Sequence, residues 1–236
     1  MIQNVYLAFI ITIVIAVSWL RLIDYLAAKG YFTSSFSRKI IHIGTGPIFV
    51  LCWILFPDEQ ISRYLAALIP LLITMQFLLV GLGVLNDEEA VRAMSRSGDR
   101  KEILKGPLIY GIVFVIMTIL FWRDSAIGII TLMILCGGDG LADIVGTKFG
   151  KDKIPWANKK SWQGSIAMFL GALTLIYLVL WAFQGMGYSY LNTKFTLLPI
   201  SGIVLIATIV ETIPYGDWDN IFVPLASVLF SYLLFA

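Results

Sequence analysis

The chain is short of charged and metal-binding side chains. Its 236 residues include one histidine, two cysteines and only 14% charged residues. Cys52 and Cys136 both lie inside apolar runs, where a free thiol behaves as a small hydrophobic group. No C-x-x-C spacing is present, so a disulfide framework and a metal site of that type are excluded.

The charge balance is nearly even, whereas the apolar content is high. A formal net charge of +2 is too small to indicate binding to nucleic acid. With 59% hydrophobic residues and a mean hydropathy of +0.88, the chain has too much apolar surface for a soluble globule. The composition therefore predicts an integral membrane protein that has the lipid bilayer as its partner, and it leaves the oligomeric state open.

Eight apolar runs follow one another along the chain. They cover residues 4–21, 39–56, 61–85, 106–122, 125–149, 162–183, 197–214 and 221–235. A bilayer core needs roughly 17–25 apolar residues per helix, so the short second and last runs leave seven spans plus a re-entrant piece as the alternative. We expect one all-α domain over residues 1–236. It would be a polytopic membrane helical bundle of about seven to eight transmembrane helices.

The first run has no basic n-region and no small-residue cleavage site, so we interpret it as a retained first helix. An Arg- and Ser-rich transit peptide is also absent, which favours a bacterial inner membrane or a processed protein of a plastid-type or thylakoid membrane.

The positive charges alternate between connections. Fourteen of the 17 Lys and Arg residues lie in odd-numbered connections between the runs and three in even-numbered ones. Basic connections stay on the cytoplasmic face or its organellar equivalent, so the odd connections are predicted to lie there. The seventh connection, ETIPYGDWDN, has no Lys or Arg. If there are eight spans, it lies on the same face as the lysine-rich fifth connection.

The most polar stretch is CGGDGLADIVGTKFGKDKIPWANKKSWQGS, residues 136–165. Two ridges of side chains recur there every four positions, as on one face of a helix. The polar ridge consists of Asp139, Asp143, Thr147 and Lys151. The ridge of small residues beside it consists of Gly138, Ala142, Gly146 and Gly150, which would let a neighbouring helix or a ligand's phosphates come close.

A second acidic group lies on the same predicted face, and it consists of Glu211, Asp217 and Asp219. Carboxylates beside ammonium groups suit a magnesium-bound polyphosphate, because Mg²⁺ takes one or two carboxylates plus phosphate oxygens. Aspartate in a span costs about 2.5–3.5 kcal/mol at the helix centre, so the pair in the fifth span indicates a compensating ligand.

Each feature alone has a simpler interpretation. A ridge of small residues is typical of helix packing, a lysine-rich connection is typical of the inner face, and an aspartate pair can bond to lysines structurally. The stretch is not a Walker loop, since Asp152 follows the Gly150-Lys151 pair. The combination of all three features on one stretch favours a phosphate site.

Three ordered motifs resemble the CTP-dependent polyprenol kinases. This family includes phytol, dolichol and farnesol kinases and is related to phosphatidate cytidylyltransferase. Their nucleotide-binding segment resembles GDGLADIVGTKFGK and NKKSWQGS here, and two further phytol kinase segments resemble SRKIIHIGTG and VETIPYGDWDNIFVPLAS. Gln163 stands where many relatives have an acidic residue, and Thr212 stands in place of a serine.

The resemblance implies phosphoryl transfer from CTP, or another nucleoside triphosphate, to the hydroxyl of an isoprenoid alcohol such as phytol. Such transfer depends on positioning and charge neutralisation. We assign Mg²⁺ to Asp139 and Asp143, and catalysis to these two together with Glu211, Asp219 and His42. The expected nucleotide-binding residues are Lys148, Lys159, Lys160, Ser161, Gly164, Asn220, Arg38 and Lys39. Among these, Ser161 and Gly164 are expected to shape the bend after the lysines.

Alternatives remain for single residues and for the whole chain. His42 has a structural alternative as a hydrogen-bonding residue, and Arg38 and Lys39 have one as interfacial anchors. A cytidylyltransferase that leaves CMP on a lipid phosphate would share the nucleotide site. A transporter would also carry intramembrane carboxylates, but no repeat is visible and the candidate residues gather near one face.

Overall fold

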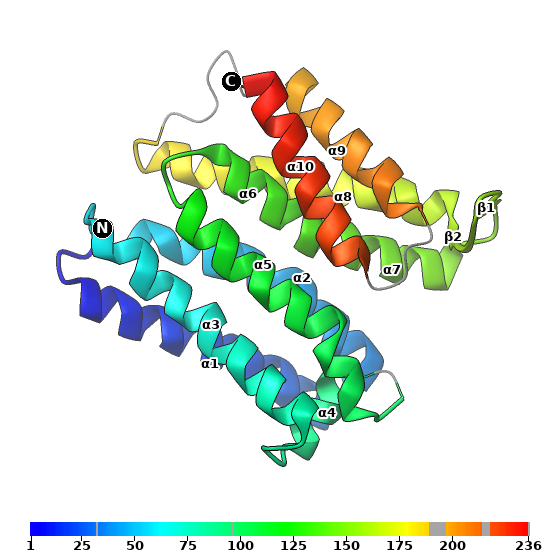
Figure 1. Cartoon of the computed structure of the whole chain (residues 1–236), viewed down its shortest axis with the longest axis horizontal. Helices are drawn as coiled ribbons and strands as arrows, with labels where there is room; N and C mark the ends of the chain where they lie inside the picture. The colour runs from blue at the N-terminus through cyan, green and yellow to red at the C-terminus, as the bar shows by residue number, and fades with distance from the viewer. Residues whose placement is uncertain (32, 96, 189–196, 214–217, 236) are drawn as a thin grey trace.

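The structure is a computed structural model that describes residues 1–31, 33–95, 97–188, 197–213 and 218–235, nearly all of them helical (Figure 1). The longer helices are α1 (Val5–Ala28), α2 (Ser34–Cys52), α3 (Gln60–Leu82), α5 (Gly106–Leu120), α6 (Ala126–Met133), α7 (Asp139–Phe149), α8 (Trp162–Gly185), α9 (Leu197–Glu211) and α10 (Asp219–Phe235). The shorter elements are η1 (Trp53–Leu55), α4 (Glu88–Met94), η2 (Arg100–Leu104), the π-helical turn η3 (Ile134–Gly138), and strands β1 (Lys153–Ile154) and β2 (Ala157–Ser161).

The predicted all-α membrane fold is confirmed. Among the described residues, five helical segments are long and apolar enough to cross a membrane, namely Val5–Ala27, Gln60–Leu82, Arg100–Leu120, Ala126–Phe149 and Trp162–Gly185. Three shorter apolar helices are Lys39–Leu55, Leu197–Glu211 and Asp219–Phe235. Each predicted apolar run therefore contains a helix, and five of the helices reach full spanning length.

The helix boundaries follow from local chemistry. Asn4 caps α1, since its Oδ1 accepts hydrogen bonds from the next helical N–H groups, and Ser161 caps α8 in the same way. Gly83 ends α3 in the left-handed region at φ 78°, where glycine carries no steric penalty. Gly137 and Gly138 lie in η3, where the helix widens into a π-turn and neighbouring helices come close to its backbone.

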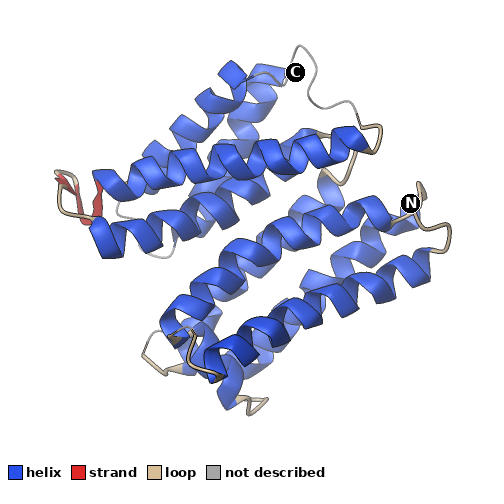
Figure 2. Cartoon of the chain, turned by 180° about the vertical axis from the view of Figure 1, so that it is seen from behind, coloured by secondary structure: helices blue, strands red, loops and turns tan. Residues whose placement is uncertain are grey.

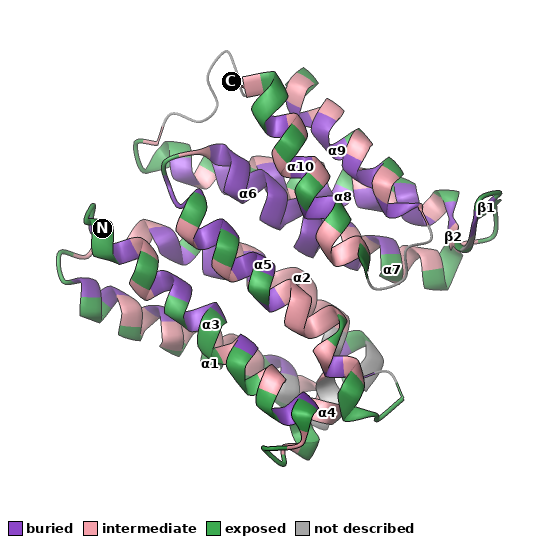
Figure 3. Cartoon of the chain, viewed as in Figure 1, coloured by how far each residue is buried: buried purple, intermediate pink, exposed green. Residues whose placement is uncertain are grey.

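The continuous rod of α6, η3 and α7 is the centre of the bundle. In the most apolar part of Ala126–Phe149, 78% of the residues are buried, against 17% in Val5–Ala27. Figure 3 shows α6 almost entirely buried, whereas α3 and α10 alternate between buried and exposed positions. Helices α2, α8 and α10 pack directly against the central turn η3. Residues on that rod are therefore held from several sides.

The connections gather at two opposite ends. In Figure 1, α4 lies at the lower right, where α3 ends and α5 begins, and the β1–β2 hairpin lies at the far right, while the N-terminus and the connection from α5 to α6 lie at the left. Figure 2, from behind, shows the hairpin at one end of an otherwise helical fold. The basic third and fifth connections thus share one end, as the count of spans predicts.

The ridge of small residues packs against a helix. A Cβ placed on Gly164 of α8 would lie 3.1 Å from the carbonyl oxygen of Ala142 and 3.3 Å from Cα of Gly146. Of the two predicted uses of this ridge, the structure shows helix packing. The polar ridge is shorter than predicted, because α7 ends at Phe149 and Lys151 lies beyond it.

Candidate active site

Residues from all three motifs line one cavity of about 1960 Å³. The predicted site residues in its wall are Lys39, His42, Asp139, Asp143, Lys159, Lys160, Ser161, Gly164, Glu211, Asp219 and Asn220. They come from α2, α7, β2, the start of α8, the end of α9 and the start of α10. Segments that lie up to about 180 residues apart in the sequence therefore meet at one end of the bundle.

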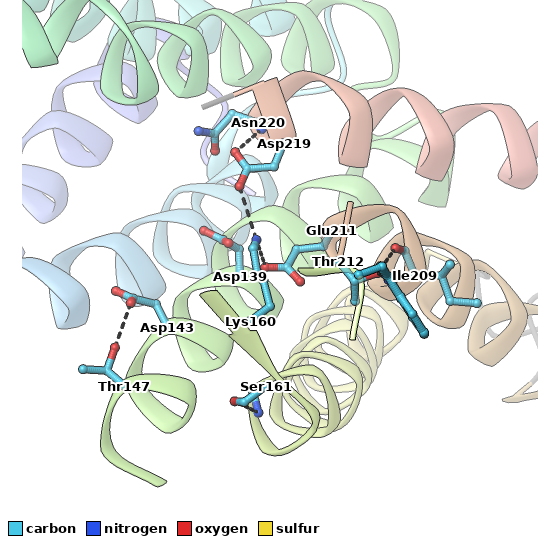
Figure 4. Close-up of polar contacts among 12 residues, drawn as sticks. Asp139, Asp143, Thr147, Lys160, Ser161, Ile209, Glu211, Thr212, Asp219 and Asn220 are labelled. Carbon is cyan, nitrogen blue, oxygen red and sulfur yellow. Dashed lines mark hydrogen bonds and ion pairs between the residues drawn. The ribbon is translucent and has the colours of Figure 1, made fainter. Parts of the chain in front are cut away.

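Lys160 on β2 is the hub of an ion-pair cluster. Its ammonium pairs with the carboxylate of Glu211, and its Nζ lies 3.5 Å from Oδ2 of Asp219 (Figure 4). The Glu211 side chain is only 5% exposed. Burial by itself lowers the pKa of Lys160, but Glu211 and Asp219, with Asp139 beyond them, outweigh burial and raise that pKa above its usual range. Lys160 is therefore held in its charged form.

The cluster contains more negative than positive charge. Asp139 acts electrostatically on Glu211, Asp219 and Lys160 alike. One ammonium thus faces three carboxylates in the wall of a cavity. Hard carboxylate oxygens in excess over cations are the ligands that Mg²⁺ prefers, and Mg²⁺ completes its shell with phosphate oxygens and water. This donor set fits a magnesium ion, although no three His, Cys, Asp or Glu side chains of the described residues already form a metal-binding group.

Asp139 begins α7 directly after the π-turn and faces His42 on α2. Its Oδ2 lies 3.6 Å from His42 Nε2, which is longer than a hydrogen bond. His42 Nε2 is buried and has no hydrogen-bond partner among the described residues. The Tyr110 ring of α5 packs on the imidazole with centroids 4.5 Å apart, and its hydroxyl donates to the His42 carbonyl oxygen at 3.2 Å. The imidazole is thus oriented while one ring nitrogen keeps its bonding capacity.

Asp143 has different partners, although it lies one helical turn from Asp139. Its Oδ2 is 3.0 Å from Nζ of Lys39, and its Oδ1 accepts a hydrogen bond from Thr147 at 3.2 Å. Figure 4 shows Asp143 and Thr147 to one side of the Lys160 cluster. The two aspartates predicted for Mg²⁺ therefore lie on one helix face, but only Asp139 belongs to the charge-rich cluster.

Ser161 and Gly164 lie at the bend after the lysines. Ser161 ends β2 and caps α8, and its Oγ accepts a hydrogen bond from the Gly164 N–H at 3.2 Å. The hairpin is tied to the end of α9, because Trp156 Nε1 donates to Thr212 Oγ1 at 3.0 Å. Both bonds fix the strand that carries Lys160.

The remaining predicted residues lie differently. Lys148 is exposed, has its Nζ 5.5 Å from the centroid of the Phe149 ring, and is not among the described residues that line the cavity. Lys159 is exposed at the cavity wall. Arg38 lies in α2, but its side chain is outside the described part of the structure, as is all of Asp217.

Comparison with known proteins shows the family to which the chain belongs. The chain is 43% identical over 222 residues to "Probable phytol kinase, chloroplastic" of Triticum aestivum, covering 93% of this chain and 74% of that protein. It is 40% identical over 212 residues to "Phytol kinase 1, chloroplastic" of Arabidopsis thaliana, covering 89% and 70%. The chain belongs to the phytol kinase family. No protein-family model matches it, and no solved structure does.

Some residues of this phytol kinase family member were not expected at the cavity. Tyr110 lies in an apolar run, and only its hydroxyl distinguishes it from the apolar residues around it. Tyrosine is common near the ends of membrane helices, so its presence there does not indicate a site. Acidic side chains of the third connection also line the cavity, including Asp87 and Glu102. Their signal is the density of acidic residues in LNDEEA and GDRKE, which the predicted site did not include.

Proposed function

We propose that the chain is a membrane kinase that transfers the terminal phosphoryl group of CTP, or of another nucleoside triphosphate, to the hydroxyl of an isoprenoid alcohol such as phytol. One observation carries the proposal. A single cavity joins the Lys160 cluster, which suits a magnesium-bound polyphosphate, to apolar walls on α1, α2, α3 and α5. The nucleotide is dissolved in water and the alcohol in the bilayer. The two can react only in a cavity that has both a charged and an apolar part.

The basic residues of the wall would bind the nucleotide. Lys159 and Lys160 supply positive charge to phosphate oxygens, and the carboxylates around Lys160 hold it in place. Mg²⁺, when bound at Asp139 with support from Asp219 or Glu211, would neutralise charge on the transferred group. These residues act by positioning and electrostatics, which is the main requirement of phosphoryl transfer.

His42 is the best-placed residue to receive the alcohol. Its Nε2 is buried in the cavity wall, lacks a hydrogen-bond partner among the described residues, and lies beside Asp139. A neutral imidazole can accept the hydrogen bond of a hydroxyl and orient its oxygen for attack. Asp139 then lies between His42, which would bind the alcohol, and the Lys160 cluster, which would bind the phosphates.

The relatives named chloroplastic, together with the apolar helices, support a plastid-type membrane as the location. The basic end of the bundle would face the stroma or cytoplasm, where nucleotides are available.

Labelled nucleotides test the reaction directly. Purified protein is incubated with Mg²⁺, CTP labelled at either the α- or the γ-phosphate, and phytol, geranylgeraniol, farnesol or dolichol. The proposal expects lipid product labelled only from γ-labelled CTP, and parallel reactions with γ-labelled ATP and UTP define the donor. Lipid labelled from α-labelled CTP would mean cytidylyl transfer and would overturn the proposal. Solute uptake in proteoliposomes, with no labelled lipid from any donor, would favour the transporter instead.

A further inference from the structure

The cavity continues from the Lys160 cluster along one face of α2. The α2 residues in its wall include His42, Thr45, Phe49 and Cys52, spaced three or four positions apart as on one helical stripe. From His42 to Cys52 is ten residues, which corresponds to about 15 Å along the helix axis. We name this part the α2 branch. It runs from the polar end of the cavity towards the opposite end of the bundle.

The walls of the α2 branch are mostly apolar, and its threonine hydroxyls are already hydrogen-bonded. Thr12 of α1 donates its hydroxyl to the Ala8 carbonyl oxygen at 2.8 Å, and Thr45 donates to the Ile41 carbonyl oxygen at 2.6 Å. Both hydroxyls are satisfied within their own helices, so a ligand need not offer them hydrogen bonds. The other walls are formed by residues that include Ala16, Leu20, Ile69, Ile73 and Phe114.

Aromatic rings close the far end of the α2 branch. The Phe49 ring lies with its centroid 6.0 Å from that of Phe114 and 6.0 Å from that of Trp53. Trp53 is fully buried behind them and packs on Trp122 at 5.0 Å. Phe49 and Phe114 line the cavity. Together with Cys52, which lies one turn further along α2, they form the floor of the α2 branch, and the Trp53–Trp122 pair lies beneath it.

Part of the cavity wall lies on the outer surface of α1, a helix long and apolar enough to cross a membrane. Val17 and Tyr25 of α1 line the cavity, yet they are 49% and 58% exposed. In a bilayer this exposed face of α1 would meet lipid, which would bring an alcohol dissolved there close to the cavity.

We infer that the α2 branch binds the isoprenoid chain of the acceptor alcohol, with the hydroxyl at His42 and the far end of the chain against Phe49 and Phe114. The floor then limits chain length, so short isoprenoid alcohols are favoured over dolichol. This inference rests on the proposed function, because it names where the acceptor of that reaction lies. The occupant follows from continuity, since one cavity joins the α2 branch to the Lys160 cluster and also reaches exposed residues of α1.

Photolabelling locates the chain without needing turnover. A farnesol analogue with a diazirine at its far end is bound to the full chain in nanodiscs without nucleotide, irradiated, and the labelled peptides are mapped by mass spectrometry. We expect label on the segments around Phe49 and Thr12, and loss of that label when phytol is added. Label on α9 or α10, or label displaced by phospholipid but not by phytol, would overturn the inference. If the label maps to the α2 branch but no alcohol is phosphorylated, only the proposed function fails.

A pair of variants on α1 tests the same inference by kinetics. Ala16 lines the cavity, whereas Val14 is 57% exposed on the same helix and is not in the described lining. Ala16→Phe should raise the KM for phytol by about tenfold, the size expected when an apolar pocket is overpacked, and should change the KM for the shorter geraniol much less. Val14→Phe should leave both values within about twofold. Equal effects of the two variants on phytol would overturn the inference, and circular dichroism confirms that each variant is folded.

Discussion

Each end of the bundle holds a cationic side chain in a polar cluster, but the two cations have different partners. Arg123, only 3% exposed, lies at the end opposite the Lys160 cluster. Its guanidinium donates to the backbone carbonyl oxygens of Trp53, Phe56 and Pro57 at 3.2, 2.8 and 2.9 Å. Its carbon Cζ also lies 5.2 Å from the centroid of the Trp122 ring. The Arg123 guanidinium also lies 3.7 Å from the carboxylate of Asp58, whose side chain is 97% exposed. Within the described structure, Lys160 has two carboxylate partners, and both are largely buried.

This contrast separates a structural charge from a functional one. The fixed donors of Arg123 satisfy carbonyl groups at the end of α2 and in the turn after η1, and Arg123 is not among the described residues that line the cavity. At the other end, carboxylates outnumber the ammonium, and Asp139 and Asp219 stand in the cavity wall. A buried charge whose hydrogen bonds are supplied by the backbone indicates a structural role. A cluster with surplus charge facing a cavity is what we propose for a ligand site.

The largest effect is expected from the carboxylates of the Lys160 cluster. Asp139→Asn should reduce phosphorylation roughly 10²–10³-fold, because it removes charge at the phosphates without changing side-chain volume. Asp219→Asn should act through the same bound group. Residues that act as one unit are non-additive, so the double variant should be about as slow as either single variant.

The readouts are γ-label transfer and the thermal stabilisation that Mg-CTP gives to the protein. Unliganded melting temperatures serve as the control for folding. If the rate loss in the double variant equals the product of the two single losses, Asp139 and Asp219 act independently. If Asp219→Asn keeps both the rate and the nucleotide stabilisation, the start of α10 is not part of the site.

The next effect is expected at the ion pair itself. Lys160→Met should destabilise the protein by about 3 kcal/mol, because it leaves the buried Glu211 carboxylate without its partner. Lys160→Met combined with Glu211→Leu should recover most of the melting temperature and yet remain inactive. Recovery of activity in the double variant would show that the pair is structural only.

The pKa shift of Lys160 adds a pH criterion. Because its pKa is raised in the folded chain, its contribution to stability is fully present below the ordinary lysine pKa and is lost only as pH rises through the higher folded value. The wild-type melting temperature should therefore show no loss from this pair between roughly pH 7 and pH 9.

Replacing Arg123 should lower stability and leave activity unchanged, which is the opposite of what is expected for the carboxylates of the Lys160 cluster. Arg123→Met removes donors from buried carbonyl oxygens, at a cost of about 1–3 kcal/mol for each group left unsatisfied. The melting temperature should fall, while phosphorylation per folded molecule stays near the wild-type value at low temperature. A selective loss of turnover without a loss of stability would contradict the structural assignment of this residue.

The sequence predicted the helices better than their contacts. Membrane-spanning segments must satisfy their backbone hydrogen bonds internally, so apolar runs such as 125–149 translate directly into helices such as Ala126–Phe149. The π-turn inside that helix was not predicted, since Gly137 and Gly138 are also typical of ordinary helix packing. The hairpin that carries Lys160 was not predicted, because two short strands leave little periodicity to detect, and only a bend after the lysines was expected.

The sequence predicted those site residues whose charge is costly in an apolar helix. It did not predict residues of types that are common in such helices. Asp139 and Glu211 stand out because carboxylates are rare in apolar helices. Tyr110, which orients His42, resembles the other aromatic side chains of its run. The floor at Phe49 and Phe114 depends on which helices become neighbours, and the apolar pattern of α2 and α5 does not specify that.

The smallest effect separates two lysines that the sequence treats alike. Lys148 and Lys159 both belong to the fifth connection, and both were predicted to bind phosphates. Lys159 lines the cavity, whereas Lys148 lies outside its described lining and beside the Phe149 ring. Removing the exposed Lys148 side chain loses at most a weak cation–π contact of about 0.5–1 kcal/mol.

Lys148→Ala should therefore leave the KM for CTP and the turnover within about twofold, as for an ordinary surface substitution. Lys159→Ala should raise the KM for CTP, because it removes a charge from the wall that would face the phosphates. Both variants remove the same side chain from the same connection, so general electrostatic attraction of the nucleotide falls equally in each. A steeper loss in Lys148→Ala than in Lys159→Ala would mean that the phosphates approach along the exposed face of α7 instead of through the cavity.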